Sequence, residues 1–158
     1  MNLYLKQRVF TWGDKFTVYD GNGGDRYYVE GEVFSWGKKL HVFDLAGNEA
    51  AYIEQKLFTF LPKYVIYING REVAEVVKEF TFFKEEYSVR GTNWTVHGDF
   101  FDHEYLVDDG GVPVAEVSKE WFSWGDAYEI RIDDRADEIL ALSVVLVIDA
   151  CIEAERNN

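Results

Sequence analysis

The chain has 158 residues, 47% of them hydrophobic and 17% aromatic, with two prolines, a composition that predicts a folded domain with a sizeable core and excludes a disordered protein. A net charge of −13 repels polyanions, so we expect no nucleic-acid partner, and anionic lipid surfaces are poor default partners. The N-terminus lacks a signal peptide and the single Cys151 cannot form an internal disulfide, which favours a cytoplasmic location.

A motif recurs along the chain from Phe10 to Asp133. Phe10–Asp20 reads FTWGDKFTVYD, Phe34–Asp44 reads FSWGKKLHVFD, and Phe122–Asp133 reads FSWGDAYEIRID. Weaker copies begin at Phe58 and Phe80. Six apolar pairs recur every 18 to 24 residues, at Phe16/Val18, Leu40/Val42, Tyr64/Ile66, Tyr87/Val89, Tyr105/Val107 and Tyr128/Ile130. Their period of two and the intervening Gly/Asn/Asp turns predict two strands per unit, hence about twelve antiparallel strands in a meander over about residues 3–133.

The last predicted element is a helix over about residues 135–155. Between Ile139 and Ile152 its only polar residues are Ser143 and Asp149, so no face of the helix is polar and all faces must be buried. The apolar part spans about 14 residues, fewer than the roughly 17–25 that cross a bilayer, so we expect no transmembrane segment. Within this helix Cys151 is expected to be a small buried hydrophobe and not a nucleophile.

The two predictions complement each other. A long meander removes its unpaired edge strands by closing into a barrel, and a barrel wider than about eight strands leaves room inside. A helix with its side chains is roughly 10–12 Å across and could fill that room. The sequence therefore predicts one domain over residues 1–158: a closed antiparallel barrel of about twelve strands around a buried C-terminal helix.

The repeats and the closing helix also resemble a known family. Lys6-Gln7, Asp14–Asp20 (DKFTVYD), Gly37–Asp44 (GKKLHVFD) and the apolar helix are similar to the LURP-one-related (LOR) family, within the tubby C-terminal-like superfamily that also holds the phospholipid scramblases. The resemblance covers about residues 1–155 and implies a twelve-stranded barrel around a C-terminal helix. It implies little about activity, because the bacterial and plant members have no established biochemical function.

The histidines are the first candidates for catalysis. His41 and His97 lie in the polar phase of their predicted strands and should face outward. His103 shares the phase of Tyr105 and Val107 and is expected in the interior as a hydrogen-bonded core residue, with a base or ligand role as the alternative. The motifs of nucleophilic, zinc and nucleotide chemistry are absent, so we predict no catalytic residue, cofactor or enzyme activity.

Four acidic residues precede the helix: Asp133, Asp134, Asp137 and Glu138. Scramblases carry a proposed calcium-binding segment at the corresponding point, and carboxylate oxygens suit Ca²⁺. The spacing does not follow an EF-hand, and a carboxylate at this place also caps a helix and favours its positive end. We therefore predict a helix cap and no metal site, with calcium as the alternative.

Two further groups have simple structural explanations. Trp12, Trp36 and Trp124 recur at one repeat position, so we expect them to pack in the core or between strands and not to form a ligand platform. Lys38 and Lys39 are expected in a solvated hairpin turn, with contact to a phosphate head group as the alternative.

Two functions from different classes follow. The first is a non-enzymatic intracellular binding or scaffold module whose outer surface or rim binds an unknown protein partner. The second is a peripheral membrane-lipid binding protein, as the similarity to tubby and scramblase domains implies through the phosphoinositides that tubby domains bind. An unrecognised enzyme that uses His103 or the pre-helix carboxylates is the third and least favoured.

Overall fold

The computed structural model describes residues 1–6, 15–32, 36–81, 84–122 and 125–156. Twelve strands precede one helix, and their bounds are β1 (Asn2–Lys6), β2 (Lys15–Asp20), β3 (Asp25–Gly31), β4 (Lys39–Phe43), β5 (Glu49–Gln55), β6 (Lys63–Ile68), β7 (Arg71–Thr81), β8 (Lys84–Arg90), β9 (Trp94–Asp99), β10 (Glu104–Asp109), β11 (Val112–Phe122), β12 (Gly125–Ile132) and α1 (Glu138–Arg156). Each predicted repeat unit contributes two strands, as expected from its two runs of alternating residues.

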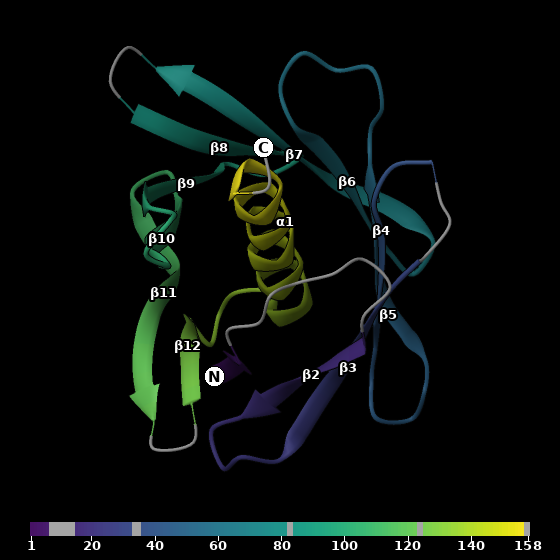
Figure 1. Cartoon of the computed structure of the whole chain (residues 1–158), viewed down its shortest axis with the longest axis vertical. Coiled ribbons are helices and arrows are strands. Elements are labelled where there is room, and N and C mark those ends of the chain that lie inside the picture. Colours follow the sequence, from purple (N-terminus) through teal and green to yellow (C-terminus); the bar gives the residue numbers. More distant parts are fainter. Residues whose placement is uncertain (7–14, 33–35, 82–83, 123–124, 157–158) are drawn as a thin grey trace.

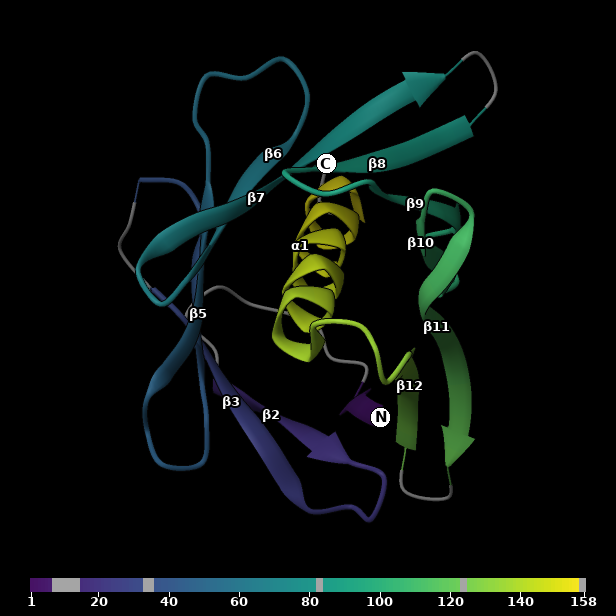
Figure 2. The same cartoon turned by 180° about the vertical axis from the view of Figure 1, so that it is seen from behind.

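The strands form a closed antiparallel barrel in which sequence neighbours pair throughout. The first and last strands close it, because β1 pairs with β12 from Asn2↔Arg131 to Lys6↔Ala127. Figures 1 and 2 show the strands as a continuous wall around α1 from both sides. Closure leaves no unpaired edge strand, which is the physical reason a meander of this length adopts it.

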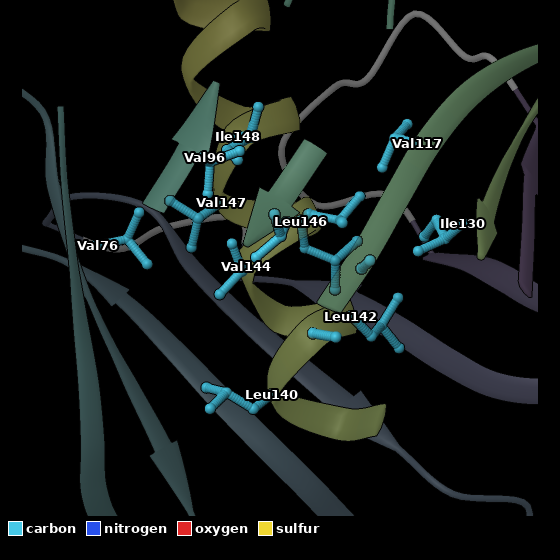
Figure 3. Packing of buried hydrophobic residues seen from close by; sticks show 14 of the residues in the cluster. Val76, Val96, Val117, Ile130, Leu140, Leu142, Val144, Leu146, Val147 and Ile148 are labelled. Atoms are coloured by element: carbon cyan, nitrogen blue, oxygen red, sulfur yellow. The ribbon is translucent and has the colours of Figure 1, made fainter. Parts of the chain in front are cut away.

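The helix lies inside this wall and is buried on all sides over most of its length. Its buried residues run without a gap from Leu140 to Ile148 and continue from Ala150 to Ile152. Figure 3 shows helix residues such as Leu142 and Leu146 in one cluster of buried side chains with barrel residues such as Ile130. The predicted closed barrel around an apolar C-terminal helix is therefore confirmed, and none of the helices in the described part of the chain has the length and hydropathy to cross a membrane.

The helix begins at Glu138, three residues later than predicted. The Oδ1 atom of Asp137 accepts a hydrogen bond from the Leu140 backbone N–H at 3.1 Å, and the Asp137 carbonyl accepts the Ala141 N–H at 3.0 Å. Asp137 is thus the N-cap residue, the position at which an Asp side chain satisfies a backbone donor that has no partner within the helix.

The repeated apolar pairs form the barrel side of the core. All their members are buried in the core cluster except Phe16, which is half-buried and packs against it. Alternation along each strand places the intervening residues on the outer face. The interior is therefore filled by strand and helix side chains together, so functional groups are to be sought on the outer wall and at the two rims.

Candidate functional site

The antiparallel meander brings the described parts of the repeat motif to one end of the barrel. The ends of β1, β3, β5, β7, β9 and β11 and the starts of the strands that follow them lie together there, because each strand reverses the direction of the one before it. The repeat rim denotes its described residues 32, 36–39, 56–63, 78–80, 84 and 100–103. The helix starts at the opposite end, the far rim, and its last turn returns to the repeat rim.

The motif aromatics that the structure describes at the repeat rim are exposed, so the predicted packing of Trp36 is wrong. Trp36 is 86% exposed, and Phe58 and Phe60, in the next connection, are fully exposed. Phe80 and Phe101 are also exposed, whereas Trp12 and Trp124 lie outside the described residues. Trp36, Phe58 and Phe60 stand in connections where no paired strand flanks them, and the helix already fills the interior.

The lysines of the chain gather at the same end. All nine lie in the half of a strand that faces the repeat rim or in a connection there: Lys6, Lys15, Lys38, Lys39, Lys56, Lys63, Lys78, Lys84 and Lys119. In the described part of the chain, all the arginines except Arg156 lie toward the far rim. The strongly negative net charge is therefore unevenly distributed, and the repeat rim is the less acidic end.

Three cationic side chains connect the last turns of the helix to the repeat rim. The Lys78 ammonium is almost fully buried and contacts the carboxylates of Glu155 and, at 3.4 Å, Glu85. Lys38 directs its ammonium to the Ala150 carbonyl at 3.5 Å. Arg156 donates to the Phe101 carbonyl at 2.8 Å. Lys38 is thus half-buried and points toward the helix, so the prediction of a fully solvated Lys38–Lys39 turn holds only in part.

His103 lies in the interior, as predicted, within a small polar cluster. Its ring stacks on Tyr128 at 4.6 Å between centroids, and the Tyr128 hydroxyl donates to the Asp149 carboxyl group. The Nδ1 atom of His103, the Tyr105 hydroxyl and Oδ1 of Asp149 are buried without a hydrogen-bond partner among the described residues. The expected hydrogen bond of the His103 ring is therefore absent at Nδ1.

Burial governs the acid–base behaviour of this interior. It lowers the pKa of His103 to about 4, with help from Arg156 and Lys119, and it raises the pKa of Asp149 to about 8, with help from Glu153. Burial also raises the pKa of the Cys151 thiol to about 11. At neutral pH the thiol is protonated and a poor nucleophile, which agrees with its predicted role as a buried hydrophobe.

The acidic residues before the helix each have a structural partner. Asp133 binds the Arg135 guanidinium at 3.0 Å, and Asp134 binds the N-terminal ammonium of Met1 at 3.1 Å. Asp137 is the helix cap, and Glu138 binds Arg26 Nη2 at 2.9 Å and accepts the Tyr27 hydroxyl. Among the described residues, no group of three or more His, Cys, Asp or Glu is arranged to hold a metal ion. Asp134 and Glu138 therefore hold the helix start to the strands at the far rim.

The other two histidines lie on the outer face, as their phase predicted. His97 Nε2 contacts Asp108 Oδ2 at 2.7 Å. His41 contacts Glu32 through Nε2 at 2.9 Å and Glu49 through Nδ1 at 3.1 Å. It lines an outer pocket together with Tyr52 and Tyr67. No motif in the sequence indicated this pocket, because its residues come from separate repeat units and meet only through the strand register.

The comparisons with known proteins agree on the fold. A family model described as LURP-one-related matches residues 1–149. An uncharacterised protein of Bacillus subtilis, YxjI, is 38% identical over 149 residues, which are 94% of this chain and 92% of that protein. The X-ray structure of an Arabidopsis thaliana protein superposes with a TM-score of 0.66 at 15% identity, over 95% of this chain and 91% of the other. The structural likeness shows the shared fold alone.

Proposed function

The chain belongs to the LURP-one-related family, and from the geometry of its repeat rim we propose that it is a non-enzymatic binding module, cytoplasmic, that docks through this rim. The single observation that carries the proposal is the exposure of the motif aromatics. Trp36 and Phe60 occupy the same position of the repeat and Phe58 begins its copy, yet all three contribute nothing to the core. Exposed large apolar side chains gathered at one place mark an interaction surface.

The occupant that fits this rim best is the interface of a lipid bilayer. The exposed aromatics come from several places along one barrel end: Trp36 lies in the β3–β4 connection, Phe58 and Phe60 lie in the neighbouring β5–β6 connection, and Phe80 lies at the end of β7. They form protruding tips along that rim. Aromatic side chains prefer the level of the lipid head groups, and lysines nearby extend their ammonium groups toward phosphates. Burying one such aromatic side chain is worth about 1.5–3 kcal/mol, so two or three suffice for reversible peripheral binding.

The charge distribution supports this orientation. The composition alone argued against anionic lipid surfaces, but the lysines lie at the repeat rim and the pre-helix carboxylates lie at the far rim. A molecule that approaches a membrane with the repeat rim first presents its least acidic end. Each lysine near an anionic surface adds about 1 kcal/mol, an attraction that salt screens.

Vesicle flotation tests the proposal with matched variants. The double variant Phe58→Ser/Phe60→Ser removes two fully exposed side chains and should weaken partition into phosphatidylcholine vesicles by more than about tenfold, with no loss of melting temperature. Leu45→Ser and Val112→Ser are the controls, because these residues are exposed in or next to far-rim connections, and they should change nothing. Added phosphatidylserine should tighten binding at low salt and lose that effect at high salt.

Failure to float with either vesicle would contradict the membrane version of the proposal. The other occupant, a protein partner with an apolar face, would then be the one that the same rim binds. It predicts that the Phe58→Ser/Phe60→Ser variant loses a partner that the Leu45→Ser variant retains. If neither vesicles nor any partner distinguish the two variants, the repeat rim is not a docking surface.

A further inference from the structure

A second surface of the barrel has the features of a ligand site, and it lies on the outer wall away from the repeat-rim aromatics. A pocket of about 410 Å³ opens on the outer face of β4, β5 and β6, with Asn69 and Gly70 at its far-rim end. Its principal side chains are Glu32, His41, Glu49, Tyr52 and Tyr67. The inference below does not depend on the proposed docking of the rim.

The strand register builds an aromatic floor. His41 on β4 pairs directly with Tyr52 on β5, and Tyr52 pairs with Tyr67 on β6. The neighbours of His41 and Tyr52 along their strands are buried, so these three side chains point outward. Ring centroids lie 4.9 Å apart for His41 and Tyr52 and 5.7 Å apart for Tyr52 and Tyr67, with 32° between the planes in both pairs.

Two carboxylates flank this floor. Glu32, just after β3, and Glu49, at the start of β5, each place one oxygen on a different nitrogen of His41. Within the part of the chain that the structure describes, neither carboxylate has another hydrogen bond or ion pair. One oxygen of each carboxylate therefore remains available to a ligand at the pocket.

The pocket is electrostatically negative. Burial and the nearby carboxylates of Glu54, Glu32 and Glu49 together raise the pKa of Tyr52 to about 12, with burial the largest cause. Burial by itself would lower the pKa of His41, but its hydrogen bonds to Glu32 and Glu49 outweigh this and raise the pKa. The wall thus already stabilises one planar cation, the His41 imidazolium, over the Tyr52 ring.

We propose that this pocket binds an organic cation, the alkylammonium group of a lysine side chain or of a free amine, on the Tyr52 and Tyr67 rings and between Glu32 and Glu49. Aromatic faces attract cations, and carboxylates bind them by charge-assisted hydrogen bonds. The aromatic floor and the two carboxylates therefore favour the same kind of ligand. Ordinary cross-strand packing explains the contact between the rings, but it does not require a hollow with two carboxylates at its edge.

His41 regulates the pocket by competing with the ligand. Protonated His41 neutralises part of the charge of Glu32 and Glu49, whereas neutral His41 leaves both carboxylates for the ligand. The other charged groups around it are Glu54 on β5 and Glu30 on β3, which pairs with His41 in the register and binds Lys15 at 3.3 Å. Affinity for the cation should therefore rise with pH as His41 loses its proton.

NMR titration of the whole chain with n-butylammonium at pH 8.5 tests the site, with 1-butanol as the uncharged counterpart. Saturable binding of the amine alone is expected. Tyr52→Leu or Tyr67→Leu should weaken it by about tenfold, the value of one desolvated cation–aromatic contact. Glu32→Gln/Glu49→Gln should weaken it at least as much. Tyr52→Phe keeps the ring and should bind like the parent, which separates loss of the aromatic face from misfolding.

Tyr4→Leu and Glu116→Gln are controls on other parts of the outer wall and should bind normally. In the parent, binding should be several-fold weaker at pH 5.5 than at pH 8.5, and His41→Gln should remove that difference.

A short peptide with one central lysine identifies the source of the amine. Tighter binding than n-butylammonium indicates a lysine of a partner protein, and equal binding indicates a free amine. Absence of saturable binding to both probes, or equal binding by the Tyr52→Leu and control variants, would overturn the assignment.

Discussion

The Nδ1 atom of His103 and the Oδ1 atom of Asp149 lie 3.7 Å apart inside the barrel, too far for a hydrogen bond. His103 precedes β10 in a left-handed backbone conformation with φ of 53°, and Asp149 is the only charged residue in the apolar part of α1. With the pKa of His103 lowered and that of Asp149 raised, both groups are neutral near pH 6. The interior thus accommodates two ionisable groups by keeping both uncharged.

Asp149 should make the protein less stable at alkaline pH. Its pKa of about 8 in the folded state exceeds the usual value of about 3.9, so the stability that it contributes is complete below about pH 4 and lost as pH rises through about 8. Asp149→Asn keeps an acceptor for the Tyr128 hydroxyl but cannot ionise. Its melting temperature relative to the parent should rise by at least about 4 °C between pH 5 and pH 8.5, equivalent to about 1–2 kcal/mol.

Glu116→Gln serves as the control, because Glu116 is an exposed carboxylate on β11. The difference in melting temperature between Glu116→Gln and the parent should be the same at pH 5 and at pH 8.5. If the Asp149→Asn difference is also independent of pH, Asp149 is ionised in the folded protein at neutral pH.

His103 should have the opposite effect on the pH dependence of stability: it should make the protein less stable at acidic pH. Burial, Arg156 and Lys119 lower its pKa to about 4, below the usual value of about 6.5, so the folded state holds it neutral and stability is lost as pH falls from about 6.5 through about 4. His103→Asn tolerates the left-handed backbone but cannot take up a proton. The variant loses the stacking on Tyr128 and should melt below the parent at pH 7.5, and the gap should narrow by pH 4.5. Thermal melts at the two pH values measure it, and a gap of constant size would show that His103 does not titrate there.

The barrel was predictable because its signal is repeated six times. Alternating pairs such as Leu40/Val42 and Tyr64/Ile66 needed no long-range information, and an all-apolar helix has few environments other than the interior. Trp36 was mispredicted because recurrence at one repeat position does not distinguish a packed aromatic from an exposed one, and strand alternation gives no orientation to a residue in a connection. The outer pocket was missed for another reason: His41 and Tyr67 lie 26 residues apart, and a one-residue slip in register would separate them.

A charge in the middle of the helix should prevent folding. Val145 is fully buried and Leu146 almost fully buried within the barrel, so aspartate at either position places a carboxyl group where the surroundings are apolar. The expected cost is more than about 5 kcal/mol, comparable with the whole stability of a domain. Val112→Asp makes the same chemical change at an exposed site and should remain folded. Soluble expression and circular dichroism distinguish them, and a soluble Val145→Asp protein with an unchanged melting temperature would place the helix outside the barrel.

The pairing of β9 with β10 should depend on the absence of a side chain at Gly98, which lies in β9 opposite Tyr105. Its φ is 142°, and a Cβ atom there would lie 2.6 Å from the Glu104 carbonyl oxygen and 2.6 Å from the Tyr105 Cα. Both obstacles are main-chain atoms of the paired strand, so Gly98→Ala must shift the backbone next to His103. We expect it to lose about 2–4 kcal/mol in chemical denaturation. Gly47→Ala is the matched control: Gly47 also has a positive φ, 86°, but open space around it, so only the backbone strain of about 1–2 kcal/mol remains. Equal losses in the two variants would mean that the close approach of β9 and β10 at Gly98 imposes no steric limit.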